Sequence, residues 1–211
     1  MAARGSPKPL VGVRVSGGMP NAGVVLMVTQ NFAKVQSRVR SSPSAPILYN
    51  VRCIMRKIDI DEVKTFIEAQ SPETKIYIGG DSERFNIGSD WYADYILCIV
   101  IHINGNNGCK IFGEVQRERD WDQKKNRPRM RLMNEVYKIA DLYIKLQDVL
   151  EDREVQVHLD INPNEMHGSS CVINEAVGYI KGMCNVIPLV KPNAFAASYA
   201  ADRYKSYMHA A

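Results

Sequence analysis

Short apolar runs alternate with polar segments from residue 59 onward, and their periods predict the secondary structure. Residues 75–80, 92–103 and 109–116 are apolar runs of strand length. The link at 104–108 consists of Asn and Gly, residues that accept positive φ and suit a tight antiparallel turn. We therefore predict three consecutive antiparallel strands that form a meander.

Helical spacing of apolar residues marks the elements on either side of this meander. Asp59 or Asp61 is a suitable N-cap for a short helix that ends before Pro72. Pro128 opens a long helix that runs to about Leu150, in which apolar residues recur at intervals of three and four. The elements that follow are predicted at residues 155–161 (strand), about 169–181 (helix), 186–190 (strand) and about 194–207 (alanine-rich helix).

This order of elements predicts the fold class. Three antiparallel strands are followed by helix, strand, helix, strand and helix, and the later strands join the sheet in parallel through right-handed crossovers. We predict an α/β domain of ribonuclease H-like topology, with a mixed five-stranded sheet and flanking helices. The order of its elements is a three-strand antiparallel meander and then β-α-β-α-β-α. Topology alone establishes no function.

The N-terminal segment has a different composition from the rest of the chain. Residues 1–58 hold nine Lys and Arg and no Asp or Glu, and 16 of the first 50 residues are Gly, Pro or Ser. We predict a poorly ordered basic leader at 1–54 and one folded domain at 55–211. Two alternatives stay open for the leader: an organelle transit peptide, or an extension that precedes a natural start at Met55.

The charge and cysteine content narrow the functional classes. Of 27 Lys and Arg residues, 18 lie after residue 58, against 23 Asp and Glu. An acidic domain argues against a protein that coats DNA passively, and it is compatible with an enzyme whose carboxylates hold divalent cations. The five cysteines have no C-x-x-C spacing, which predicts free thiols and a cytoplasmic location. No apolar run reaches the length of a membrane span.

Four acidic residues fall at positions where the predicted fold could bring them together. Asp81 ends the first strand and Asp160 ends the strand at 155–161, and ligand crevices lie beyond the carboxyl ends of strands in parallel-type sheets. Glu135 lies on the apolar face of the long helix, where an acid is costly unless it is paired or bound to a metal. Asp202 lies on the last helix, whose alanines allow close approach to the sheet.

Each of these acids also has a simpler interpretation. Asp81 suits a turn, Glu135 could pair with an arginine, and Asp202 could form a surface pair with Arg203. The combination is more specific than its members, because clustered carboxylates are the ligands of Mg²⁺ and Mn²⁺, and such ions activate water for phosphodiester hydrolysis. It predicts a divalent-metal-dependent nuclease that uses a two-metal mechanism, with Asp81, Glu135, Asp160 and Asp202 as metal-binding and catalytic residues. The alternative is a catalytically inactive module that binds nucleic acid or protein.

A charged segment at 117–131 leads into the long helix and holds seven Lys and Arg against three acids. We predict that it contacts nucleic acid through Arg127, Arg129, Arg131 and Trp121, with the arginines on phosphates and the indole stacked on a base. A solvated charged loop is the equally open alternative. Lys191 is predicted to orient a phosphate, and His158 and Ser82 are predicted to support the acids from behind.

Four short motifs resemble the YkuK family of ribonuclease H-like proteins, and the resemblance covers roughly residues 58–205. They are Ile78-Gly-Gly-Asp-Ser82, His158-Leu-Asp-Ile-Asn-Pro163, Gly178-Tyr-Ile180 and the run from Val190 to Asp202. The His-x-Asp-Ile-Asn strand and the Lys-Pro…Ala-Ser…Ala-Asp ending are the most specific. The resemblance implies a ribonuclease H-like domain in which Asp81, Glu135, Asp160 and Asp202 stand where that superfamily carries metal-binding acids. Glu135 is matched by its position on the helix, and the basic leader is not part of the pattern.

Overall fold

The computed structural model describes residues 26–28, 57–105, 108–122, 127–150 and 152–201. Its helices and strands are, in chain order, β1 (Leu26–Val28), α1 (Ile60–Glu68), β2 (Lys75–Ile87), β3 (Asp90–His102), β4 (Cys109–Arg119), α2 (Arg129–Leu146), β5 (Val155–Leu159) and α3 (Ile173–Cys184). Short 3-10 turns lie at Ile103–Gly105, Gln147–Val149 and Gly168–Val172, and a π-helical turn, η5, at Ala196–Ala200.

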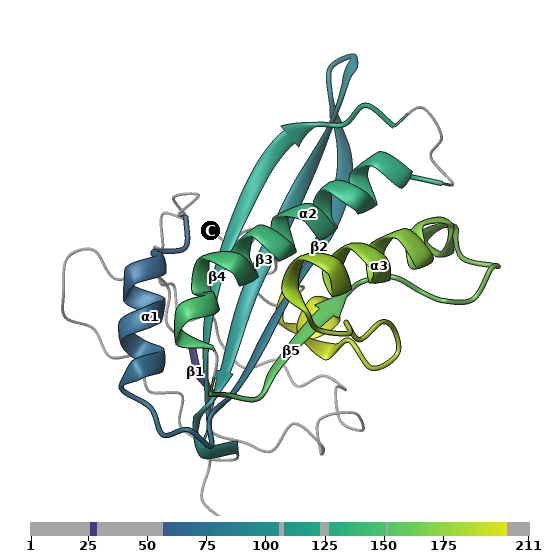
Figure 1. The fold of residues 1–211 in the computed structure, drawn as a ribbon. Coiled ribbons are helices and arrows are strands. Elements are labelled where there is room, and N and C mark those ends of the chain that lie inside the picture. Colours follow the sequence, from purple (N-terminus) through teal and green to yellow (C-terminus); the bar gives the residue numbers. More distant parts are fainter. Residues whose placement is uncertain (1–25, 29–56, 106–107, 123–126, 151, 202–211) are drawn as a thin grey trace, which may run out of the picture.

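One mixed sheet, in the strand order β1-β4-β3-β2-β5, forms the centre of the fold. Strands β2, β3 and β4 pair antiparallel as the predicted meander, and β5 pairs with β2 in parallel. Helices α2 and α3 lie across one face of the sheet (Figure 1). The η5 turn packs on the other face, where a methyl group added to Gly79 would meet the backbone nitrogen of Ala197 at 2.9 Å. The mixed α/β class is therefore confirmed.

The prediction of a strand at 186–190 is wrong, so the predicted domain contributes four strands and not five. Leu189 makes one parallel bridge to His158, with hydrogen bonds of 2.9 and 2.8 Å to the β5 backbone. The ladder does not continue because the Lys191 N–H donates to the carbonyl oxygen of Ile161 over 3.0 Å, two residues beyond the Leu159 carbonyl that a regular parallel register would use. The three-residue β1, which pairs with β4, comes from the predicted leader; residues 1–25 and 29–56 lie outside the described residues.

Strand β2 is longer than predicted, and this changes the position of Asp81. The strand does not end at Gly80 but runs to Ile87, because β3 supplies a backbone partner for every residue of it. The turn follows at Gly88, whose φ of 62° favours glycine. Asp81 thus lies inside the antiparallel pairing of β2 with β3, opposite Ile96. The parallel pairing of β2 with β5 ends one residue earlier, at Gly80.

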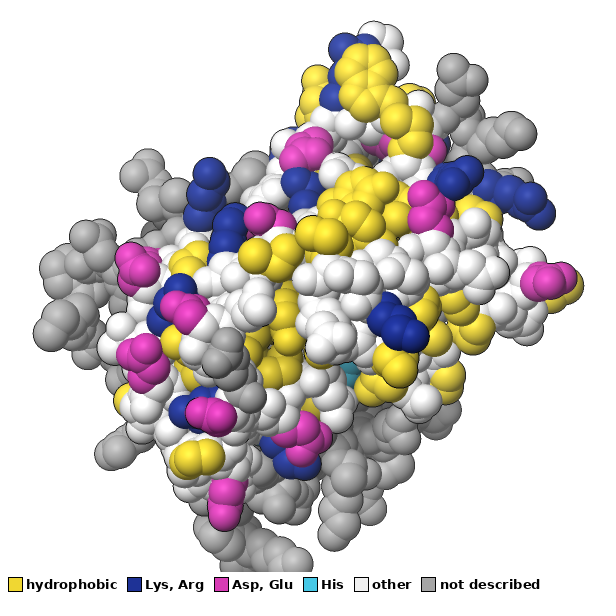
Figure 2. Space-filling view, in the orientation of Figure 1, with side chains coloured by type: hydrophobic (Ala, Val, Ile, Leu, Met, Phe, Trp, Pro, Cys, Tyr) yellow, Lys and Arg dark blue, Asp and Glu magenta, His cyan; other side chains and the backbone are white. Residues whose placement is uncertain are grey.

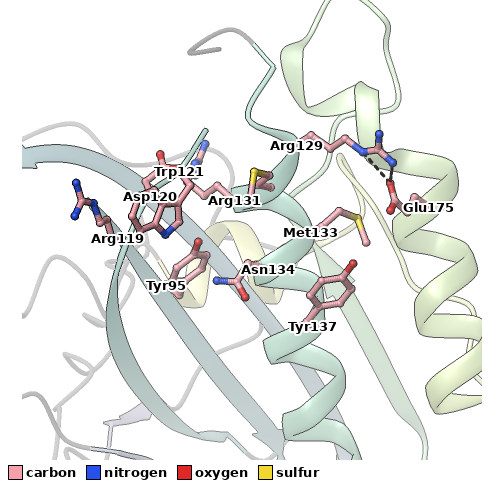
Figure 3. Close-up of a pocket in the computed structure, with 11 residues that line it drawn as sticks. Tyr95, Arg119, Asp120, Trp121, Arg129, Arg131, Met133, Asn134, Tyr137 and Glu175 are labelled. Atoms are coloured by element: carbon pink, nitrogen blue, oxygen red, sulfur yellow. Dashed lines mark hydrogen bonds and ion pairs between the residues drawn. The ribbon is translucent and has the colours of Figure 1, made fainter. Parts of the chain in front are cut away.

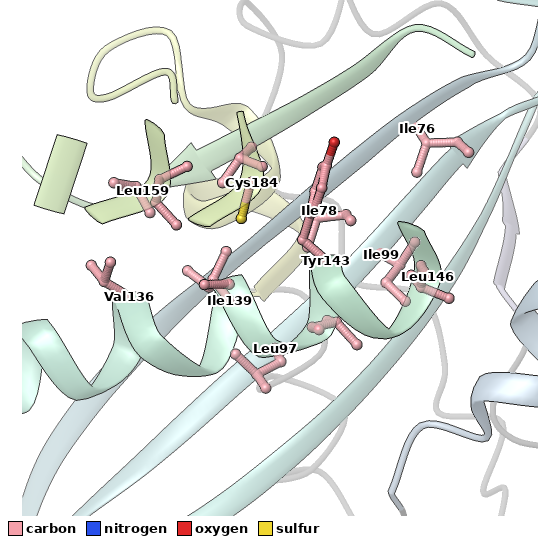
Figure 4. Close-up of a cluster of buried hydrophobic side chains, with 14 of the residues drawn as sticks. Ile76, Ile78, Leu97, Ile99, Val136, Ile139, Tyr143, Leu146, Leu159 and Cys184 are labelled. Carbon is pink, nitrogen blue, oxygen red and sulfur yellow. The ribbon is translucent and has the colours of Figure 1, made fainter. Parts of the chain in front are cut away.

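The main hydrophobic core lies between the sheet and its helices. The apolar period predicted for the long helix is confirmed, since its repeating residues are all buried: Leu132, Val136, Ile139, Tyr143, Leu146 and Leu150. They pack on Ile76, Ile78, Leu97 and Ile99 of β2 and β3 (Figure 4). A smaller cluster, which includes Tyr77, Ile96 and Ala196, lies on the other face beneath η5. No described helix is both long and apolar enough to cross a membrane.

Candidate carboxylate site

Asp81 and Asp160 emerge from hydrogen-bonded neighbouring strands. Gly80 and Leu159 are partners in the parallel β2–β5 register, and the two aspartates are the next residues on each strand. Side chains alternate along a strand, so Asp81 shares the face of Gly79, which η5 covers. Asp160 projects to the same face, because the Ser198 hydroxyl donates to its Oδ1 atom over 3.1 Å. The structure thus brings together the two strand acids that the sequence singled out.

Asp160 is held by a cation as well as by a hydroxyl. The Nζ atom of Lys191 lies 2.8 Å from its Oδ1 atom and 2.9 Å from its Oδ2 atom. Lys191 therefore lies beside one of the candidate carboxylates. Its contact in the structure is with Asp160, and its role on a phosphate stays a prediction.

Glu135 points inward from α2, as its place on the apolar face predicts, and is only 1% exposed. Its Oε2 atom accepts a hydrogen bond from the Ser82 hydroxyl over 2.6 Å, whereas its buried Oε1 atom has no hydrogen-bond partner among the described residues. Burial, together with the charges of Asp81 and Asp160, raises the pKa of Glu135 to about 8, against the opposing effect of the Ser82 hydrogen bond. The three acids therefore share one electrostatic environment.

Two supporting side chains connect these acids to the rest of the fold. Arg131 donates from Nη1 to the Ser82 hydroxyl over 2.6 Å and also to the Ser82 carbonyl oxygen. On the opposite face, His158 accepts a hydrogen bond at Nδ1 from the Ala196 N–H over 3.0 Å. Burial lowers the pKa of His158 to about 4, so the ring is neutral at pH 7 and joins η5 to β5. Ser82 thus contacts Glu135 directly, whereas His158 contacts η5, and the supporting role predicted for both residues stays a prediction.

The described residues include no group of three or more His, Cys, Asp and Glu side chains placed to hold a metal ion. Glu135 approaches from the face of α2 through Ser82, whereas Asp81 and Asp160 project toward η5. Asp202, the fourth predicted acid, lies outside the described residues, as does the predicted extension of the last helix to 207. Metal binding by the four acids therefore stays a prediction.

The charged segment before α2 is partly built into the fold. Asp122 caps α2, because its two carboxylate oxygens accept the N–H groups of Met130 (3.1 Å) and Arg131 (2.7 Å). Buried Asp120 pairs with the Nε atom of Arg84 at 2.7 Å. Sequence reasoning missed both roles, and the interpretation of the segment as a solvated loop is wrong for these two acids. The available signal was that Pro128, at the start of α2, has no side chain that can cap it.

The predicted nucleic-acid contacts occupy the surface around this cap. Arg127 and Arg129 are exposed, and Arg129 pairs with Glu175 of α3. Trp121 is 63% exposed, with the guanidinium of Arg119 located 4.4 Å from its ring centroid. Arg131 was predicted to face a phosphate at the surface, but its guanidinium points inward and donates to Ser82.

A pocket of about 530 Å³ opens between these side chains and α2 (Figure 3). It is lined by Tyr95, Arg119, Asp120, Trp121, Arg129, Met130, Arg131, Met133, Asn134, Tyr137 and Glu175. In the space-filling view, hydrophobic side chains with Lys and Arg beside them gather over the N-terminal half of α2 and at the tip of the β2–β3 hairpin (Figure 2). Only three of the lining residues, Trp121, Arg129 and Arg131, were singled out from the sequence.

Comparison with known proteins identifies a family for this chain. A family model described as ribonuclease H-like matches residues 59–206 of the 211-residue chain. The matched range begins at the N-cap of α1 and includes every candidate acid. No curated protein and no solved structure gives a significant match.

Proposed function

Because the chain belongs to the ribonuclease H-like family, we propose that it is a divalent-metal-dependent nuclease that hydrolyses phosphodiester bonds of nucleic acid. One observation carries this proposal. Asp81 and Asp160 directly follow the paired residues Gly80 and Leu159, and both acids act electrostatically on the buried carboxyl of Glu135. The motifs that resemble the YkuK family lie within the matched residues 59–206.

The donor set fits a hard divalent cation. Mg²⁺ and Mn²⁺ prefer carboxylate oxygens, which Asp81, Asp160 and Glu135 would supply together with Asp202. The buried Oε1 atom of Glu135 lacks a hydrogen-bond partner among the described residues, a situation that costs about 1–3 kcal/mol and that a bound cation relieves. When bound, such ions neutralise the charge of the phosphodiester and lower the pKa of the attacking water.

The residues around the acids have separate roles in this proposal. Lys191 provides a positive charge beside Asp160 that can orient a phosphate oxygen. Glu135 keeps its proton at pH 7 in the absence of a cation, because its pKa is about 8. Arg131, acting through Ser82, stabilises the Glu135 anion once the proton leaves. Cation binding therefore releases a proton and strengthens as the pH rises.

A second candidate is a ribonuclease H-like module that binds nucleic acid or protein without turnover. It is favoured by the contacts of Asp160. Both of its carboxylate oxygens already have partners in Lys191 and Ser198, so the charge of Asp160 is balanced without a metal ion. Calorimetric titration of the full-length chain with Mn²⁺ distinguishes the two candidates. Saturable binding that Asp81→Asn removes supports the nuclease, and an absence of binding supports the module.

The nuclease proposal is tested by cleavage with the full-length protein. Labelled RNA, DNA and RNA–DNA hybrids are incubated with Mn²⁺ and with EDTA, and initial rates are compared for wild type, Asp81→Asn and Asp160→Asn. We expect each substitution to reduce the rate at least about 100-fold, the size of effect seen when a single transition-state charge stabiliser is removed. Asp141→Asn, which changes an exposed acid on α2 that pairs with Lys145, serves as the control and leaves the rate unchanged. Equal cleavage by wild type and the Asp81→Asn/Asp160→Asn double variant would refute the site.

A further inference from the structure

We propose that the pocket between β4 and the N-terminal half of α2 binds one unpaired nucleobase, so that the chain selects single-stranded nucleic acid. The pocket encloses about 530 Å³ and is lined mainly by aromatic, arginine and methionine side chains. The view that the bound strand is also the substrate for cleavage rests on the proposed nuclease function. Base binding itself does not, and it is measured without cleavage.

Trp121 forms one wall of this pocket and presents a large exposed ring. It is 63% exposed although it is a large hydrophobic residue. Arg119, which is itself anchored to Asp90 over 2.7 Å, lies 4.4 Å from the ring centroid. Among the described residues no aromatic ring packs on Trp121. The indole is therefore oriented by a cation and has ring surface on which a base can stack, an interaction worth about 1–3 kcal/mol per base.

The facing wall comes from α2 and is also apolar. Tyr137 is 42% exposed and packs edge-on against Tyr179 at 4.7 Å between ring centroids, which fixes its orientation. In Figure 3, Trp121 and Tyr137 lie on opposite sides of the group of lining residues, with Asn134 between them and Tyr95 beside Trp121. A base inside a duplex has both faces covered by its neighbours, so it cannot stack here. An unpaired base can, and this is why the geometry selects single strands.

The rim of the pocket provides positive charge for the backbone of the strand. Three arginines and two acids line it, namely Arg119, Arg129, Arg131, Asp120 and Glu175. The acid Asp120 is already neutralised by Arg84. The ion pair between Arg129 and Glu175 is 66% and 40% exposed at its two side chains, so solvent screens it and it adds little to stability. A phosphodiester can therefore replace Glu175 as the partner of Arg129 at little cost.

Arg131 connects the pocket to the candidate acids. It lines the pocket and also donates to Ser82, whose hydroxyl donates to Glu135. Arg129 and Glu135 are six positions apart on α2, or about 9 Å along its axis. About three stacked nucleotides span this length at about 3.4 Å each. A strand with one base in the pocket is therefore long enough to pass the level of Glu135 on α2 within about three nucleotides.

The test uses full-length protein in EDTA, so that no cleavage occurs. Fluorescein-labelled single-stranded DNA, single-stranded RNA and a blunt DNA duplex of the same sequence are titrated by fluorescence anisotropy. We expect Trp121→Ala to weaken binding of both single strands by about 5- to 100-fold and Trp121→Phe to restore most of it. Duplex binding, which uses phosphate contacts alone, stays unchanged.

The chain offers a matched control, because its other tryptophan has a similar setting outside the pocket. Trp91 lies on the β2–β3 hairpin, is 40% exposed, and has the Arg84 guanidinium 4.3 Å from its ring centroid. Trp91→Ala leaves single-strand binding unchanged. The chain has two tryptophans, so Trp91→Phe makes Trp121 the sole indole emitter, and we expect single strands to quench its fluorescence.

The two proposals fail in different ways. Equal losses in Trp121→Ala and Trp91→Ala, equal losses for single strands and duplex, or no quenching of Trp121 would each overturn the base pocket. If cleavage depends on Asp81 but Trp121→Ala binds single strands like wild type, the base-pocket proposal is refuted and the nuclease proposal stands. If the protein binds single strands selectively through Trp121 but cleaves no substrate, the base-pocket proposal is supported and the nuclease proposal is refuted.

Discussion

The hydroxyl of Ser82 donates a hydrogen bond to the Oε2 atom of Glu135 over 2.6 Å, and this contact joins β2 to α2 at the candidate site. Arg131 donates to the same hydroxyl over 2.6 Å. Ser82 thus lies between the partly buried guanidinium of Arg131 and the buried carboxyl of Glu135, which cannot turn to solvent for a replacement partner. The stability of the site depends on this serine.

Ser82→Ala removes this link, and we expect it to lower the free energy of unfolding by about 1–3 kcal/mol. The buried Oε2 atom of Glu135 loses its donor, and Arg131 loses an acceptor. Urea denaturation followed by circular dichroism measures the change. Ser170→Ala is the control, because its hydroxyl donates at the surface to the carbonyl of His167. A loss as large in the control as in Ser82→Ala would contradict the prediction.

Glu135 makes the stability of the metal-free protein fall as the pH rises. Its pKa is about 8 when folded, against an ordinary value of 4.5. Between these values the unfolded chain releases the proton and the folded chain keeps it, so the folded state binds more protons. The stabilisation is complete below pH 4.5 and is lost as the pH approaches 8.

The expected loss for wild type between pH 5 and pH 8 is a few kcal/mol, at about 1.4 kcal/mol per pKa unit. Glu135→Gln cannot ionise and should therefore show a flatter profile, with a higher stability than wild type at pH 8. Urea unfolding in EDTA at several pH values measures it. Glu165→Gln, at an exposed position, keeps the wild-type slope; parallel profiles for wild type and Glu135→Gln would refute the assignment.

Gly79 marks the closest approach of η5 to the sheet. A methyl group there would meet the Ala197 nitrogen at 2.9 Å and the carbonyl oxygen of His158 at 3.0 Å, and both are backbone atoms. Gly79→Ala should destabilise the protein by about 1–3 kcal/mol, because η5 must move away from β2 and β5. Thermal unfolding measures the effect.

Gly178 on α3 provides the matched comparison for this substitution. No atom lies within 4 Å of a methyl group placed there, and alanine is favoured over glycine inside a helix by about 0.5–1 kcal/mol. Gly178→Ala should therefore raise the melting temperature while Gly79→Ala lowers it. A change of the same sign in both variants would show that η5 does not pack as described.

Asp122 caps α2 from outside the helix, and its removal should cost about 0.5–2 kcal/mol. In Asp122→Ala the N–H groups of Met130 and Arg131 lose their acceptors. Because Arg131 also positions Ser82, the variant should weaken the site more than a surface change does. Chemical denaturation is compared with that of Asp141→Ala, which alters an exposed acid on the same helix. A stability loss no greater than that of Asp141→Ala would show that the cap is not formed.

Features that depend on a few neighbouring residues were predictable from the sequence. Asp59 caps α1 with hydrogen bonds to the N–H groups of Asp61 and Glu62, as a helix start requires. The apolar period of α2 specified its buried face, including the inward position of Glu135. Both follow from local geometry, because capping and helical periodicity act within one or two turns.

Features that depend on a distant partner were not predictable. Strand β2 extends seven residues past Gly80 to Ile87 because β3 is there to pair with it. The segment at 186–190 makes one bridge instead of a strand because its register to β5 shifts after Leu189, where Lys191 bonds to Ile161. Asp122 caps a helix that begins seven residues later, a contact that no short sequence pattern encodes.

The candidate site shows the same division between local and distant causes. The chain alone identified Asp81, Glu135 and Asp160 as acids in unusual positions, because strand and helix periods state which way each side chain points. Folding then paired Gly80 with Leu159, which brings two of the acids together, and placed Ser82 against Glu135, 53 positions away in the chain. Register and packing set those contacts, and both arise from the fit between whole elements rather than from the residues beside each acid.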